Sequence, residues 1–108
     1  MYTFPFEHSQ FPETKFRLRQ FTTKQMFDVM QAMPLEKMTS DDAYRFFEWC
    51  VEDWTNAPTI RPGHLIKDFD KERFDDVHPL AVLLAVQHAI LCSHLSEDEI
   101  KNLGTQSK

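Results

Sequence analysis

The longest apolar stretch of the chain, residues 80–95, constrains the fold more than any other feature of the sequence. Its aliphatic residues lie almost all the way round a helix of 3.6 residues per turn: Leu80, Val82, Leu83, Leu84, Val86, Ile90 and Leu91. A helix with no polar face must be surrounded by other elements. The stretch is shorter than the roughly 20 residues that span a bilayer, and it contains Gln87, His88 and His94. We therefore predict a buried core helix over residues 79–95 and no membrane-spanning segment.

A second helix is predicted from its start signal. Thr22, followed three residues later by Gln25, forms a capping box in which each side chain binds a backbone N–H that would otherwise lack a partner. Pro34 cannot continue a helix. The pattern therefore predicts a helix over residues 23–33.

Two further helices follow from similar signals. Thr39 or Ser40 is the start of one helix, and the two aspartates that follow stabilise its N-terminal end by their negative charge. The apolar residues that come next predict a helix over residues 40–56. Ser96 and Glu99 form a second capping box, which predicts a short helix over residues 97–103.

The first 21 residues alternate between apolar and polar, as the two faces of a strand do. Aromatic residues take every second position of the first strand: Tyr2, Phe4 and Phe6. Basic residues take every second position of the second strand, and we expect them to face water: Lys15, Arg17 and Arg19. Pro5 cannot donate a ladder hydrogen bond, so the segment should be an edge strand or an extended arm. We predict a β-hairpin over residues 2–21 with its turn around residues 11–14.

The remaining segment, residues 57–78, shows no periodic pattern, and we expect only a short helical turn near residues 71–75. The chain has two glycines in 108 residues, whereas all-β folds use glycine in their many turns. We therefore predict an α+β fold that is mainly α, with an N-terminal β-hairpin packed on a three- to four-helix cluster. A chain of this length forms one domain, which we place at residues 1–104, followed by a loose tail over residues 105–108.

The formal net charge of −5 argues against nucleic acid and anionic membranes as partners, because both carry negative charge. Cys50 and Cys92 each lie in an apolar helical pattern, so we expect both to be buried, reduced and unpaired. The N-terminal residues lack the basic region and apolar region of a signal peptide. We therefore expect a cytoplasmic protein.

The strongest candidate for chemistry is the pair His88 and Cys92, which are adjacent on one helix face because four residues separate them. A closed zinc site would need two more ligands, for which His64, His78 and Glu48 are candidates by residue type alone. A Cys–His nucleophile would need a third group that orients the histidine. With two glycines the chain has no glycine-rich phosphate loop. We predict no catalytic residue, no metal and no cofactor, and a protein that is not an enzyme.

Four of the five methionines cluster in or just after the helix predicted over residues 23–33: Met26, Met30, Met33 and Met38. Such a stripe can fill a core, or it can form an adaptable binding surface because the flexible thioether packs against different partners. Trp49 breaks the apolar face of the helix over residues 40–56, and exposed aromatic residues often anchor interfaces. Together with the edge of the hairpin, these features predict the partner-binding residues Arg17, Arg19, Met26, Met30, Met33 and Trp49.

The stretch from Phe4 to Met33 combines an aromatic strand, a basic alternating strand that ends at Phe21, and a helix capped by Thr22. This pattern resembles the N-termini of small tail-assembly and baseplate-assembly chaperones of tailed bacteriophages. The resemblance covers about thirty of the 108 residues. It implies a non-enzymatic assembly factor that protects aggregation-prone tail components before they polymerise, and it assigns no role to a single residue.

We therefore predict a non-enzymatic protein-binding factor, a bacteriophage tail or baseplate assembly chaperone or small structural subunit, that acts in the cytoplasm of the host cell. Its partner would be a tail or baseplate component or a host protein, and homo-oligomerisation is compatible with this function. The alternative is a small acidic phage-encoded inhibitor of a host protein, an anti-defence or takeover factor, which fills a basic cleft through charge complementarity. In that case the charged segment Lys67–Asp76 is the expected contact.

Overall fold

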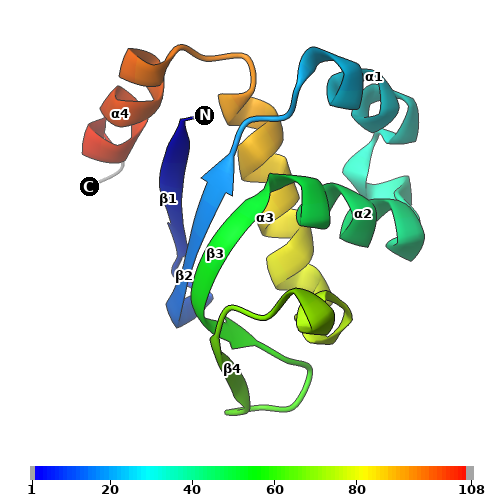
Figure 1. The fold of residues 1–108 in the computed structure, drawn as a ribbon, viewed down its shortest axis with the longest axis vertical. Coiled ribbons are helices and arrows are strands. Elements are labelled where there is room, and N and C mark those ends of the chain that lie inside the picture. Colours follow the sequence, from blue (N-terminus) through cyan, green and yellow to red (C-terminus); the bar gives the residue numbers. More distant parts are fainter. Residues whose placement is uncertain (1, 107–108) are drawn as a thin grey trace.

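A computed structural model describes residues 2–106 of the chain (Figure 1). The chain folds into a four-stranded antiparallel sheet with helices packed on one of its faces. The prediction of a mainly α fold with a single hairpin is therefore wrong, and the chain is an α+β fold with a four-stranded sheet. The N-terminal hairpin is only half of the sheet, and the other two strands come from segments predicted to be a helix end and an irregular connection.

The sheet has the simplest possible order, since its strands lie side by side as they follow in the chain: β1 (Thr3–His8), β2 (Phe11–Arg19), β3 (Val51–Pro58) and β4 (Leu65–Asp68). β1 is an edge strand, the first of the two alternatives that Pro5 predicted. The prediction of a turn around residues 11–14 is wrong. The turn consists of Ser9 and Gln10, and Phe11 already belongs to β2.

α2 (Ser40–Cys50) runs directly into β3, so the prediction of one helix over residues 40–56 is also wrong. Val51 and Trp54 continue the helical spacing of apolar residues, and both are buried. They point to the same side of β3 because a bulge at Glu52 lies between them, where β2 pairs with residues 51 and 53 of β3 and skips residue 52. In a bulged strand, buried residues can therefore lie three positions apart in the sequence, as they do in a helix.

The segment over residues 57–78 is ordered rather than irregular. It contains β4 and the short 3₁₀ helix η2 (Lys71–Asp76), which is the helical turn expected there. Phe69 and Phe74 turn inwards and pack on Trp54 of β3, at 4.8 Å and 5.7 Å between ring centroids. These aromatic contacts hold the charged segment against the sheet.

α3 (Pro79–Cys92) packs against β2 and α2. Its buried face consists of small residues and valines, which let the helix lie close to the sheet: Ala81, Val82, Ala85, Val86 and Ala89. The prediction of a helix that is buried all round is only partly right, because Leu80 and Leu91 are 41% and 51% exposed. The helix also ends at Cys92 rather than at residue 95.

Two helices flank this core at the top of Figure 1, α1 (Thr23–Ala32) on one side and α4 (Glu97–Gln106) on the other. Both predicted capping boxes are present. Thr22 Oγ1 accepts from the Gln25 N–H at 3.1 Å, and Ser96 Oγ accepts from the Glu99 N–H at 3.2 Å.

The ends of these two helices differ from the sequence-based expectations. α1 stops at residue 32, and a 3₁₀ turn, η1 (Leu35–Lys37), follows it before α2. α4 continues through Gly104 to residue 106, whereas the prediction placed its end at residue 103. Of the predicted loose tail over residues 105–108, the last two residues lie outside the described part of the chain.

The face of the sheet away from the helices is polar. Lys15, Arg17, Asp53 and Thr55 are exposed there on the two central strands, and Arg17 is directly opposite Asp53. Within residues 2–106, no helix is long and apolar enough to cross a membrane.

Candidate functional site

His88 and Cys92 lie together on α3, as their spacing predicted. His88 Nε2 is 3.6 Å from Cys92 Sγ, and the sulfur belongs to a fully buried residue. The imidazole ring stacks on Phe6 at 4.6 Å and lies 5.8 Å from Phe4, both measured between ring centroids. The pair therefore sits in an aromatic environment between β1 and α3.

This environment disfavours charge on either group. Burial raises the pKa of the Cys92 thiol to about 11 and lowers the pKa of His88 below its ordinary value. At neutral pH the pair is a protonated thiol beside a neutral imidazole, whereas a nucleophilic cysteine must be a thiolate. Cys50 is also fully buried and unpaired, and burial raises the pKa of its thiol as well. Both cysteines therefore behave as core residues.

The other histidines considered as metal ligands have structural contacts of their own. His78 Nδ1 accepts from the Leu80 N–H at 3.1 Å and so caps α3. His64 Nδ1 lies 3.3 Å from Thr59 Oγ1 in the loop between β3 and β4. Among the described residues, no three His, Cys, Asp or Glu side chains come together as a metal site would require.

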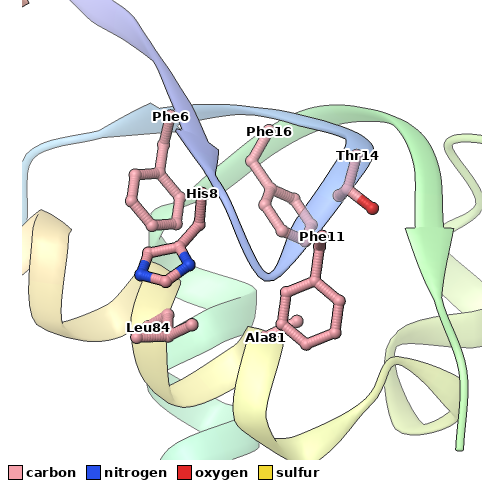
Figure 2. Close-up of a pocket in the computed structure, with 7 residues that line it drawn as sticks. All are labelled: Phe6, His8, Phe11, Thr14, Phe16, Ala81 and Leu84. Carbon is pink, nitrogen blue, oxygen red and sulfur yellow. The ribbon is translucent and has the colours of Figure 1, made fainter. Parts of the chain in front are cut away.

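A small cavity lies beneath the turn between β1 and β2, where side chains of both strands point towards α3 (Figure 2). Its walls are formed by Phe6, His8, Phe11, Thr14, Phe16, Ala81 and Leu84. Its volume of about 10 Å³ holds roughly one water molecule. The cavity is a gap in the packing and is too small for a substrate.

The two arginines predicted to bind a partner differ in their surroundings. Arg17 is exposed on the polar face of the sheet and donates to Thr3 Oγ1 at 3.0 Å. Arg19 donates through Nε to the Trp49 carbonyl oxygen at 2.6 Å and through Nη1 to Glu52 Oε1 at 2.8 Å. Arg17 is thus accessible to another molecule, while Arg19 ties β2 to the end of α2 and to the bulge of β3.

Trp49 is half-buried, and its ring lies 5.4 Å from that of Phe46 in the core. The guanidinium carbon of Arg45 lies 5.4 Å from the centre of the Trp49 ring, a cation–π contact. Trp49 therefore already has packing partners within the molecule and is only partly accessible.

The methionine stripe of α1 faces mainly outwards. Val29 is the fully buried residue of this helix, and Met26 is half-buried against the core. Phe27 is 67% exposed, Met30 is 65% exposed, and Met33, just after the helix, is 42% exposed. We call these three residues the methionine ridge. Of the two alternatives left open by the sequence, a core stripe and a binding surface, the exposure of the ridge favours the second.

Phe27 was not among the predicted site residues, although it is the most exposed member of the ridge. The sequence carried no signal for this exposure. Met26 and Phe27 lie about 100° apart on the helix, and two neighbours at that separation can both face a core, as Phe46 and Phe47 of α2 do.

A groove of about 620 Å³ is lined by residues of β1, α3 and α4. Of these elements, β1 and α4 lie on the opposite side of the ribbon from α1 (Figure 1). Residues that line it include Tyr2, Phe6, Glu7, His88, Leu91 and Leu103. None of the predicted site residues lies here. The groove combines residues from both ends of the chain, which local sequence patterns do not bring together.

No protein-family model matches the chain, and searches of curated proteins and of solved structures found no match either.

Proposed function

We propose that this chain is a non-enzymatic protein-binding factor that uses the methionine ridge of α1 as its contact surface. The observation that carries the proposal is the exposure of Phe27 and Met30, about two thirds of each side chain, on a helix that buries only Val29 completely. Large apolar residues on neighbouring turns of a helix are the anchors of helix-in-groove recognition.

The composition of the ridge supports binding to a shaped apolar surface. Methionine has an unbranched side chain with a polarisable sulfur, so it adapts to irregular partner surfaces. Phenylalanine supplies a rigid anchor of the kind that dominates binding energy at the centre of interfaces. Arg17 on the open sheet face and the half-buried Trp49 remain the other proposed contacts.

The protonation states of the Cys–His pair agree with the proposal of a non-enzymatic protein. The only Cys–His contact in the described part of the chain pairs a protonated thiol with a neutral histidine under two aromatic rings. Within this class, we propose the more specific role of an assembly chaperone or small structural subunit of a bacteriophage tail or baseplate. That role is supported by the resemblance of residues 4–33 to such chaperones.

The test is comparative capture with a matched control. Tagged wild-type chain and the variants Met30→Glu and Ile60→Glu are used to isolate partners from cells that express tail and baseplate proteins. Ile60 is 73% exposed on the loop between β3 and β4, so its variant adds the same charge away from the ridge. We expect wild type and Ile60→Glu to retain a tail or baseplate component, and Met30→Glu to lose it.

Equal capture by Met30→Glu and wild type would refute the ridge as the contact surface. The salt dependence of the captured complex separates the assembly role from the inhibitor role. An apolar contact through the ridge should change little between roughly 0.05 and 0.5 M salt, whereas a contact through exposed charges is screened over that range. A complex lost at high salt would favour an inhibitor that binds through the segment Lys67–Asp76.

A further inference from the structure

We infer that Met30 and Met33 form a site of reversible oxidation, at which a hydroperoxide converts the two thioethers into sulfoxides and makes the methionine ridge polar without unfolding the chain. The loss of partner binding that follows rests on the proposed use of the ridge as a contact surface. The oxidation itself depends on which sulfur atoms solvent reaches and on how little of the ridge belongs to the core.

The methionine sulfur atoms belong to side chains that differ widely in exposure. Met30 is 65% exposed on α1, and Met33, just after this helix, is 42% exposed. Met26 and Met38 are half-buried and pack against the core. An oxidant in solution must touch a sulfur atom to oxidise it, so the two methionines of the ridge should react before the two that the core covers in part.

The two cysteines do not compete for the oxidant. A peroxide oxidises a cysteine in its thiolate form, and Cys50 and Cys92 are both fully buried and unpaired. Burial raises the pKa of the Cys92 thiol to about 11, and it raises the pKa of the Cys50 thiol as well. At neutral pH both thiols are therefore protonated and shielded from solvent. In the described part of the chain, the thioethers of the ridge are the sulfur atoms that a peroxide meets first.

Each oxidation transfers one oxygen atom from the peroxide to sulfur. A lone pair of the thioether attacks one oxygen of hydrogen peroxide, the O–O bond breaks, and an S–O bond forms. The proton on the transferred oxygen passes to the departing hydroxide, so the products are a sulfoxide and water. Sulfur is oxidised and the peroxide is reduced. A methionine sulfoxide reductase reverses the step with two thiols as reductant, which are released as a disulfide together with water.

The position of the ridge separates this change from the stability of the fold. Val29 is the residue of α1 that the core buries completely, whereas Met30 and Met33 are exposed. A sulfoxide at an exposed position stays hydrated, so it should change the free energy of unfolding little. The added oxygen atoms are hydrogen-bond acceptors beside Phe27, and they turn an adaptable apolar surface into a polar one. Oxidation therefore changes what the ridge can bind and leaves the chain folded.

The experiment treats the full chain with dilute hydrogen peroxide at neutral pH and follows three quantities. Peptide mapping by mass spectrometry measures oxygen uptake at each methionine and cysteine over time. Retention on a phenyl-substituted resin measures the accessible apolar surface, and circular dichroism with thermal unfolding measures the fold. The control is the double variant with Met30→Leu and Met33→Leu, which keeps the ridge apolar at nearly the same volume but has no thioether there. Both chains contain Met1, so the difference between them isolates the ridge.

We expect the two methionines of the ridge each to take up one oxygen atom before Met26, Met38 or either cysteine does. Retention of wild type on the resin should then fall while the chain stays folded, and a sulfoxide reductase should restore it. Retention of the double variant should not change. The inference is overturned if a cysteine, Met26 or Met38 is oxidised as fast as Met30, if the oxidised chain unfolds, or if its retention is the same as before.

Partner capture separates this inference from the proposed function. Wild type and the double variant are treated with peroxide, freed of it, and used to capture the tail or baseplate component. We expect capture by oxidised wild type to weaken roughly tenfold or more, the usual effect of losing one apolar anchor, and capture by the treated double variant to stay unchanged. Undiminished capture by wild type with both sulfoxides in place overturns the ridge as contact surface and leaves the oxidation site. Oxidation at other sulfur atoms overturns the inference and leaves the ridge.

Discussion

Replacement of two phenylalanines, Phe47 and Phe27, by alanine tests the division of this chain into a packed core and an exposed ridge. Phe47 on α2 is fully buried and is the centre of the aromatic core. Its ring meets those of Phe16 and Phe74 edge-on, at 5.7 Å in each case, and lies parallel to that of Trp54 at 6.4 Å. It therefore connects α2 to β2, β3 and η2.

The expected magnitudes differ widely for the same chemical change. Truncation of a buried phenylalanine to alanine costs about 3–5 kcal/mol, and Phe47 has three aromatic partners, so we expect the upper part of that range. For a domain of this size, that loss lowers the melting temperature by roughly 15–30 °C. Phe27 is 67% exposed, so Phe27→Ala should change the free energy of unfolding by less than about 1 kcal/mol.

Urea denaturation followed by tryptophan fluorescence measures both values, because Trp49 and Trp54 lie in the core region. Phe47→Leu is a milder companion that keeps the side chain apolar, and it should cost less than Phe47→Ala. The reasoning is refuted if Phe27→Ala costs more than about 2 kcal/mol, since that loss is typical of a packed side chain and not of an exposed ridge.

Three further predictions follow from single side chains. Cys92 should resist iodoacetamide at pH 8 in the native protein and react after unfolding in urea, because its buried thiol has a pKa of about 11; rapid native alkylation detected by mass spectrometry would contradict this. The lowered pKa of His88 means that the unfolded chain takes up the proton first as the pH falls below about 6.5, so stability is lost from there down through the lower pKa of the folded state. His88→Gln should therefore flatten the fall of the free energy of unfolding between pH 7 and 5, and an unchanged pH profile would contradict the assignment. Arg17→Glu should weaken partner capture without loss of the fold, because Arg17 is exposed and its hydrogen bond to Thr3 is on the surface; unchanged capture by a folded variant would remove Arg17 from the contact surface.

Local patterns in the sequence determined the elements whose signals lie within a few residues. The capping boxes at Thr22 and Ser96 position α1 and α4, because they depend on contacts between residues three apart. The alternation in the first 21 residues positions the hairpin, and Pro5 keeps its first strand out of the centre of the sheet. The spacing of His88 and Cys92 correctly indicated that the two side chains touch.

Only the tertiary structure decided that residues 51–58 form a strand. Their apolar spacing fits a helix and a bulged strand equally well. Pairing with β2 selects the strand, and that partner lies more than thirty residues away in the chain. Tertiary packing also decided the exposure of the methionine stripe, because apolar residues spaced for burial remain on the surface when no other element covers them. The core has room for one side of α1, and Val29 occupies it, so Phe27 and Met30 remain exposed to solvent.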